Sequence, residues 1–174
     1  RCKLRETLTE PFGAVPVLNM RAASAAEIVR RGAKTVHIEL TGECYDGTSQ
    51  NVCATIPGTD KPSEVITLGG HYDSVYFSAG VHDNLSGSVI VLELLRYFAA
   101  HPPRRTLRFC WFGSEEQGLL GSKAYVKAHA DELKDCVAML NFDVAAPTLG
   151  SNHLVTLATD DALHYVAGGL REAG

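Results

Sequence analysis

The 174-residue sequence lacks any apolar run close to the roughly 18 residues that cross a bilayer, so no membrane-spanning helix is expected. It also lacks an excess of basic residues, because its formal net charge is −4, and a surface for nucleic acid is not expected. Internal repeats and low-complexity tracts are absent. With 45% hydrophobic and 21% charged residues, the chain has the ordinary composition of a globular domain with a buried core.

The first residues, Arg1-Cys-Lys-Leu-Arg-Glu, contain neither an initiator methionine nor the apolar core of a signal peptide. We therefore expect the sequence to be part of a longer chain, whose location the missing leader does not reveal. Pro11, Gly13 and Pro16 interrupt any regular pattern near the start. From their position, residues 1–20 are expected to be the tail of an inserted or preceding domain.

Cysteines are few, odd in number and without the CxxC spacing of a zinc-thiolate site: Cys2, Cys44, Cys53, Cys110 and Cys136. The last three lie in strand-like runs, where a buried free thiol that packs as a small hydrophobic group is the more common situation. A disulfide from Cys44 to another cysteine stays open if the protein is secreted.

Hydrophobic periodicity and turn residues predict the main elements of secondary structure. Strands are expected over 14–18, 35–41, 51–56, 65–69, 106–112, 136–142 and 154–158, and helices over 24–31, 86–100, 122–130 and 161–172. Ser24 and Glu27 form a capping box at the start of the first helix, and Gly32 ends it. The strand–helix–strand order from 65 to 112 predicts parallel pairing with a right-handed crossover, and the apolar strand 65–69 is expected to be central.

Histidine and carboxylate side chains follow several of these apolar strands. They are His71, Asp73, Asp83, Glu115, Glu116 and Asp143. Loops at the carboxyl ends of strands converge in open α/β sheets, so these side chains are expected to meet there. Nitrogen and carboxylate ligands suit zinc, and a carboxylate can bridge two ions that together polarise a carbonyl and acidify a water. One glutamate of the pair could then bind metal while the other takes the proton of the water.

Simpler explanations compete for each residue alone. A single aspartate at the end of a strand is more often a helix cap, and adjacent glutamates more often lie on a solvated face. His82, beside Asp83, is expected to be a surface or pocket-lining residue rather than a ligand. Asp73, two residues after His71, is the expected partner that orients the imidazole. What favours a metal site is that all six groups follow apolar strands.

Four motifs occur in order, and together they are more specific than any one of them. They read Gly-Gly-His71-Tyr-Asp73-Ser, Gly80-Val-His-Asp83-Asn-Leu-Ser-Gly, Phe112-Gly-Ser-Glu115-Glu116-Gln-Gly-Leu-Leu-Gly-Ser and Asn141-Phe-Asp143. In these motifs the sequence resembles the co-catalytic zinc aminopeptidases, the family of bacterial leucyl-type aminopeptidases and aminopeptidase Y, with glutaminyl cyclases and the transferrin receptor as relatives. The resemblance extends from about residue 51 to residue 143.

This resemblance implies a role for each residue of the motifs. His71 and Asp143 would bind one zinc ion, Asp83 would bridge, Glu116 would bind a second zinc ion, Glu115 would be the general base, and Asp73 would orient His71. The implied fold is an α/β sandwich with a mixed, mostly parallel central sheet flanked by helices. The implied activity is the removal of N-terminal residues, preferably apolar ones, from a peptide substrate by way of a metal-bridging water. Family likeness also favours an exported protein.

One feature of the family pattern has no counterpart here. Members carry a fifth ligand, a histidine well beyond the Asn-x-Asp motif, whereas the later histidines of this chain, His153 and His164, lie in no matching motif. Residues 21–174 are therefore expected to form a zinc peptidase-like α/β domain that is incomplete at its C-terminal end.

Two other functions stay open at this point. One is a non-catalytic peptidase-like binding domain, as in the transferrin receptor, and the other is acyl transfer of the glutaminyl cyclase type. The intact pair Glu115-Glu116, together with His71, Asp83 and Asp143, favours the peptidase, because a binding domain needs no general base.

Overall fold

The computed structural model describes residues 3–8, 15–35, 37, 39 and 46–145. The chain divides into two compact units, Arg1–Asp46 and Gly47–Gly174. This division lies at residues 46 and 47, whereas the sequence places a domain boundary after residue 20. The origin of residues 1–20 in an inserted or preceding domain stays a prediction.

The described residues of the first unit form a two-stranded antiparallel sheet and one helix. Strand β1 (Lys3–Leu8) pairs with strand β2 (Val15–Asn19), which agrees with the strand predicted over 14–18. Helix α1 (Ala22–Arg30) begins two residues before the predicted range of 24–31. The ion pairs of Glu27 with the arginines at the helix end lie on its exposed surface.

The capping box predicted at Ser24 is wrong. Ser24 lies inside the first turn, no side chain caps the helix, and the carbonyl of Arg21 accepts the first hydrogen bonds instead. The alanines at positions 22 and 23 are strong helix formers, so the helix extends past Ser24 towards the N-terminus. It ends as predicted, because Gly32 has a φ of +60°, which favours glycine.

The strand predicted over 35–41 is wrong for the residues of that range that can be described. Thr35, His37 and Glu39 are exposed and belong to no strand. Alternation of apolar and polar residues shows which face could be buried, but a strand also needs a partner to pair with. The remaining residues of this range, Cys2 and Cys44, and the elements predicted at 154–158 and 161–172 lie outside the described residues.

In the second unit, the described residues form a four-stranded sheet with strand order β3-β5-β4-β6. Its strands are β3 (Val52–Ile56), β4 (Lys61–His71), β5 (Arg105–Phe112) and β6 (Cys136–Asn141). Strand β4 runs parallel to both β5 and β6, while β3 is antiparallel to β5. The predicted mixed, mostly parallel sheet and the central place of the strand at 65–69 are therefore confirmed.

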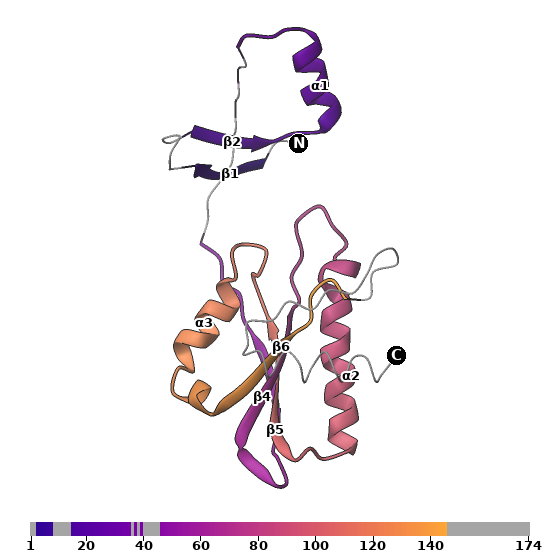
Figure 1. Cartoon of the computed structure of the whole chain (residues 1–174), viewed down its shortest axis with the longest axis vertical. Helices are drawn as coiled ribbons and strands as arrows, with labels where there is room; N and C mark the ends of the chain where they lie inside the picture. The colour runs from indigo at the N-terminus through magenta and orange to yellow at the C-terminus, as the bar shows by residue number, and fades with distance from the viewer. Residues whose placement is uncertain (1–2, 9–14, 36, 38, 40–45, 146–174) are drawn as a thin grey trace, which may run out of the picture. The chain divides into compact units, whose positions relative to one another are not determined.

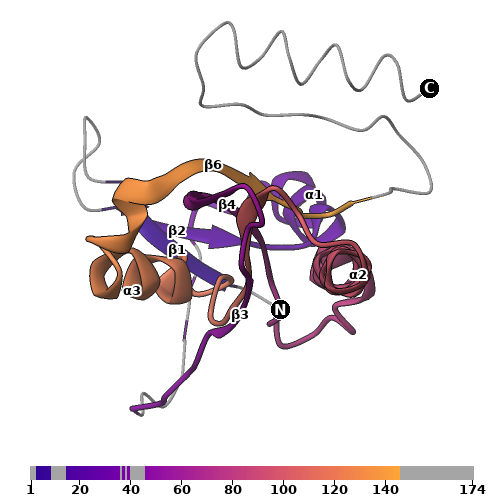
Figure 2. The same cartoon turned by 90° about the horizontal axis from the view of Figure 1, so that it is seen from below.

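Helices α2 (Ser86–Ala100) and α3 (Leu120–Ala128) cover opposite faces of this sheet (Figures 1 and 2). Helix α2 has the predicted bounds, because the His101-Pro-Pro segment ends it. Helix α3 begins two residues before the predicted range of 122–130. Among the residues that the structure describes, no helix is both long and apolar enough to cross a bilayer.

The face of the sheet towards α2 holds the main core. Leu68 of β4, Val91 of α2, and Leu107 and Phe109 of β5 are buried together. Alternate residues of β5 point to this side because side chains of a strand alternate between its faces. The predicted packing of α2 directly on the sheet is thus confirmed.

Not all of the predicted apolar surface of α2 is buried. Val91, Leu95 and Phe98 pack against the core, but Val89 and Leu92 are each 44% exposed. Only one face of a helix can pack against a sheet. Because the apolar surface of α2 extends beyond that face, some of its apolar side chains stay exposed in the described part of the chain.

The face towards α3 is a smaller cluster of Cys110, Phe112 and Tyr125, with Leu133 packed against it. The prediction that the strand cysteines are buried holds for Cys110, which is fully buried. It is wrong for Cys53, which is exposed because β3 is the outer strand of the described sheet, and Cys136 is intermediate.

Candidate metal centre

His71 is the last residue of β4 and is only 3% exposed. Its Nδ1 lies 3.0 Å from the carbonyl oxygen of Asp73, and its own carbonyl accepts a hydrogen bond of 2.7 Å from the hydroxyl of Ser88. A carbonyl only accepts hydrogen bonds, so Nδ1 carries a proton and donates. The other ring nitrogen, Nε2, is thereby the one available to a cation when the ring is neutral.

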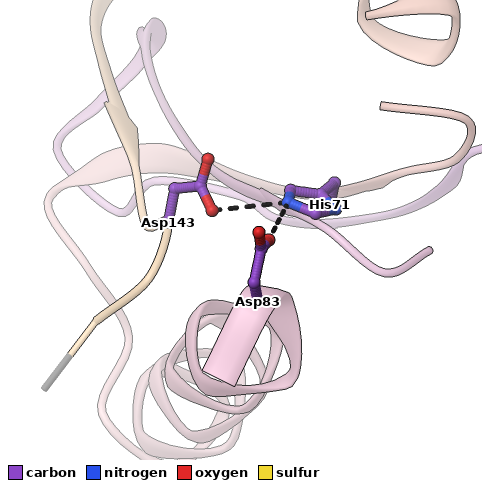
Figure 3. Close-up of side chains that lie close together, drawn as sticks. All are labelled: His71, Asp83 and Asp143. Carbon is purple, nitrogen blue, oxygen red and sulfur yellow. Dashed lines mark ion pairs between the residues drawn. The ribbon is translucent and has the colours of Figure 1, made fainter. Parts of the chain in front are cut away.

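Two carboxylates converge on that nitrogen (Figure 3). Nε2 lies 3.1 Å from Oδ1 of Asp83 and 3.3 Å from Oδ1 of Asp143, and the three ligand atoms all lie within 4.8 Å of one another. Zinc ligands at about 2.0–2.1 Å in tetrahedral geometry are separated by about 3.3 Å. The cluster of His71, Asp83 and Asp143 therefore has the spacing and the donor atoms of a site for such a cation.

Parallel pairing is what assembles this cluster. Strands β4 and β6 run side by side, so His71 at the end of β4 and Asp143, two residues beyond β6, reach the same edge of the sheet. Asp83 comes from the turn η1 (Val81–Leu85), directly before α2, in which the backbone of Asp83 and Asn84 is not helical. Gly80, with a φ of +66°, starts this turn in a conformation that favours glycine.

Asn84 connects the Asp83 turn to the segment that carries Asp143. It is 1% exposed, its amide nitrogen donates to the carbonyl of Phe142 at 2.9 Å, and its oxygen accepts from the amides of Gly87 at 3.0 Å and Val144 at 3.3 Å. The sequence alone indicates no role for Asn84, because its burial and its partners, 58 and 60 residues further along the chain, depend on the tertiary structure. A buried amide needs such polar partners.

Replacing Asn84 by alanine is expected to weaken binding of Zn²⁺ by about 10- to 100-fold, the usual effect of losing a side chain that orients a metal ligand. The reason is that the variant loses the two side-chain hydrogen bonds that join the Asp83 turn to the Asp143 segment, together with the one from the amide of Gly87. Competition titration against a zinc-binding dye measures the dissociation constant. The matched control is Gln117→Ala, at an exposed position of the neighbouring loop, and equal affinity of a folded Asn84→Ala variant would contradict the assignment.

Glu115 and Glu116 lie in the loop after β5, at the same edge of the sheet. Oε2 of Glu115 is 3.8 Å from Nε2 of His71, so this carboxylate borders the cluster. Glu116 is not a member of the cluster, but its Oε1 is buried and has no hydrogen-bond partner among the described residues. A buried carboxylate oxygen without a partner is costly unless a cation or proton satisfies it, so Glu116 fits a role as a further ligand.

Asp73 holds the glutamate loop in place. Its Oδ1 accepts a hydrogen bond of 2.9 Å from the amide of Glu115, and its Oδ2 accepts one of 3.3 Å from the amide of Glu116. The carbonyl oxygen of Asp73 lies 3.0 Å from Nδ1 of His71, whereas its carboxylate lies 3.6 Å from the same nitrogen. Asp73 thus contacts the imidazole mainly through its backbone, while its carboxylate positions the two glutamates.

Asn51 closes the same loop from the other side. Its side chain accepts a hydrogen bond from the amide of Gly113 at 3.2 Å and donates one to the carbonyl of Gly121 at 2.9 Å. These two glycines are also joined by a backbone hydrogen bond of 3.0 Å. The sequence predicts Asn51 only as the start of a strand, because its partners lie about 60 to 70 residues further along the chain.

The charges around the cluster shift two pKa values. Burial alone would lower the pKa of His71, but the carboxylates of Asp143, Glu115 and Asp83 and the carbonyl of Asp73 outweigh it, so the pKa is raised. Burial raises the pKa of Glu115, and the neighbouring carboxylates add to this against the opposing effect of His71. Several carboxylates around one imidazole leave an excess of negative charge, which favours a bound cation.

A cavity of about 420 Å³ adjoins the cluster. His71, Glu115 and Asp143 border it, and most of the rest of its lining is apolar, including Leu119, Val126 and Met139. An apolar cavity with a few polar groups at one end is the usual form of a site for a small ligand or a side chain.

The structure thus brings together three of the six residues singled out in the sequence, His71, Asp83 and Asp143. It places Glu115 beside them and Asp73 beneath the loop of Glu115 and Glu116. His82 is exposed and stands outside the cluster.

The fold and the cluster together define a mixed α/β domain with a candidate metal centre at the carboxyl edge of its sheet. The sequence model of Peptidase family M28 matches residues 51–169, which is more than half of the chain. The chain belongs to this family, which confirms the relationship indicated by the four motifs.

Individual proteins of known name are similar over part of their length. The aminopeptidase of Pseudomonas aeruginosa (strain UCBPP-PA14) is 42% identical over 93 residues, which are 52% of this chain and 17% of that protein. Leupeptin-inactivating enzyme 1 of Streptomyces exfoliatus is 45% identical over 107 residues, and aminopeptidase YwaD of Bacillus subtilis is 33% identical over 132 residues. The chain covers 24% and 28% of these two proteins, so it spans about a quarter of their length.

Two solved structures show the same arrangement of elements. A zinc aminopeptidase from Bacillus subtilis matches 54% of this chain and 24% of its own length, with 36% identity and a TM-score of 0.51. A Peptidase M28 precursor from Shewanella amazonensis matches 77% of this chain and 32% of its own, with 30% identity and a TM-score of 0.59. The mixed α/β fold is therefore that of the family.

Proposed function

We propose that this chain carries the metal centre of a zinc-dependent aminopeptidase. The observation that carries the proposal is the convergence of Asp83 and Asp143 on Nε2 of His71, at 3.1 and 3.3 Å, with Glu115 beside them. The names of the similar proteins, among them a zinc aminopeptidase, support zinc as the metal and a peptide as the substrate.

His71, Asp83 and Asp143 would hold one zinc ion. A second ion would share Asp83 and take Glu116, whose buried oxygen has no partner among the described residues. Zinc, when bound, supplies a Lewis acid that polarises the scissile carbonyl and lowers the pKa of a water. Nδ1 of His71 keeps its proton and donates a hydrogen bond to the carbonyl of Asp73, and this bond holds the ring with Nε2 towards the ligand position.

Glu115 would take the proton of the attacking water and pass it to the leaving amine. Its carboxylate borders His71 at 3.8 Å without belonging to the ligand cluster, which is the place required of a base. The two hydrogen bonds that the Asp73 carboxylate accepts from the amides of Glu115 and Glu116 would hold these two residues in their separate roles. The adjoining apolar cavity would accept the side chain of the residue removed, which favours apolar residues.

The complete gene product, loaded with zinc, is expected to release nitroaniline from leucyl-p-nitroanilide and to lose this activity in 1,10-phenanthroline. Added Zn²⁺ is expected to restore it. Activity that is insensitive to the chelator, or none after zinc loading, would contradict the proposal.

The same zinc-loaded protein can be used to distinguish the aminopeptidase from a glutaminyl cyclase and from a non-catalytic binding domain. A peptide with an N-terminal glutamine distinguishes the reactions, because a cyclase releases ammonia and an aminopeptidase releases the residue. Tight zinc binding without turnover of either substrate would identify a binding domain instead.

A further inference from the structure

Two cysteines of the second unit lie side by side although 57 residues separate them in sequence. Cys53 of β3 is the direct partner of Cys110 of β5 in the antiparallel ladder. The sulfur atoms are 3.5 Å apart, and the Cys53 thiol donates a hydrogen bond to the Cys110 sulfur. Neither residue belongs to the metal cluster, and the pair plays no part in the proposed hydrolysis.

The geometry of such a pair suits a disulfide. Residues directly opposite in an antiparallel ladder have Cα atoms about 4.5 or 5.5 Å apart, and both values fall within the range of about 4.4–6.8 Å found for disulfides. The sulfur atoms, now 3.5 Å apart, would have to approach to about 2.05 Å. We expect rotation of the two side chains to supply this change, because the register already places the residues opposite each other.

We infer that Cys53 and Cys110 are a redox pair, and that a low-molecular-weight disulfide such as oxidised glutathione converts them to a disulfide that joins β3 to β5. This inference does not depend on the proposed peptidase function, because it rests only on the strand register and the positions of the two sulfur atoms.

The different exposure of the two thiols sets the order of the reaction. Cys53 is exposed, whereas Cys110 is fully buried against Phe112 and Tyr125. Burial and the neighbouring Cys53 raise the pKa of Cys110 to about 12, so the Cys110 thiol stays protonated. Its complete burial keeps the oxidant away from it. Cys53 is therefore the residue that meets the reagent first.

The exchange balances with the reagent named. The Cys53 thiolate attacks one sulfur of oxidised glutathione, forms a mixed disulfide and releases one glutathione thiolate. The Cys110 sulfur then attacks the Cys53 sulfur, its proton passes to the departing second glutathione, and the protein disulfide forms. In total, two protein thiols are oxidised and one glutathione disulfide is reduced to two glutathione molecules.

The cross-link would close a long loop of the chain. The 57-residue separation encloses β4, η1 and α2, and with them His71 and Asp83. Closing a loop of this length restricts the unfolded chain, and the midpoint of thermal unfolding is expected to rise by about 10 °C. Reduction by dithiothreitol is expected to reverse the rise.

The test is to incubate the complete gene product with oxidised glutathione, alkylate the remaining thiols and map the linked peptides by mass spectrometry. The expected result is a Cys53–Cys110 link, the loss of two alkylation sites and the higher unfolding midpoint. Cys53→Ser changes an exposed position and is expected to abolish both the link and the rise, whereas Cys136→Ser is the control that keeps both.

Three outcomes would overturn the inference. They are full alkylation of both residues after oxidation, a link from Cys53 to another cysteine such as Cys44, and a mixed glutathione disulfide on Cys53 that never resolves. Cys110→Ala provides the complementary measurement, because it is expected to trap glutathione on Cys53. A link that forms with no change in unfolding midpoint would show that the pair does not stabilise the fold and would contradict that part of the inference.

Discussion

Glu115→Gln is expected to lower kcat on leucyl-p-nitroanilide by about 1,000-fold, within the range of about 10²–10⁴ that general bases contribute. Glutamine has nearly the same shape as glutamate but cannot accept the proton of the attacking water. The side chain borders Nε2 of His71 at 3.8 Å without being one of the three clustered ligands, so zinc content is expected to remain. The measurement pairs steady-state kinetics with zinc content determined by mass spectrometry of the metal.

The control for this substitution is Glu93→Gln. Glu93 is an exposed residue of α2 that contacts Arg96 at 3.6 Å, so the same chemical change is made away from the cluster. Its kcat and zinc content are expected to stay unchanged. If Glu115→Gln keeps full turnover, Glu115 is not the base, and if it loses zinc together with activity, Glu115 is a ligand instead.

Gly87→Ala is expected to destabilise the protein by about 3 kcal/mol or more, at the upper end of the cost of overpacking. An added Cβ would overlap the carbonyl oxygen of Phe142 and would stand 2.5 Å from Oδ1 of Asn84. Neither atom can move away freely, because both belong to the hydrogen bonds that join the Asp83 turn to the Asp143 segment. The unfolding midpoint is expected to fall by about 6–12 °C.

The same substitution is expected to reduce zinc binding, since it separates Asp83 from Asp143. Gly47→Ala is the matched control, because a Cβ there would meet no described atom within 4 Å. Thermal unfolding followed by circular dichroism checks the first effect, and dye competition checks the second. An unchanged midpoint for Gly87→Ala would show that α2 can shift away from the Phe142 carbonyl, contrary to the packing described.

In the second unit, the local sequence pattern was sufficient to predict the bounds of elements that are long and strongly apolar. The helix over 86–100 and the strand over 106–112 were predicted to within one residue, because an apolar face and a terminating proline or glycine lie within a short stretch. Helix α1 shows the limit of such signals. Its sequence contains a capping box at Ser24, yet two alanines before it prefer the helix, and the helix begins there.

The segment over 35–41 shows a second limit. Its alternation is typical of a strand, yet Thr35, His37 and Glu39 lie in none. Strand formation depends on a partner that is distant in sequence, and no property of these residues alone supplies one.

By itself, the sequence determined which residues are candidates for the metal centre. Each of His71, Asp83, Glu115 and Asp143 lies at the end of an apolar strand, just after one or just before a helix, and that placement is a local property. Only the tertiary structure decided which of them meet, that Asn84 joins the two aspartate segments, and that Cys53 faces Cys110. Those contacts depend on strand order and register, which arise from packing between segments about 40 to 70 residues apart, and no local pattern encodes them.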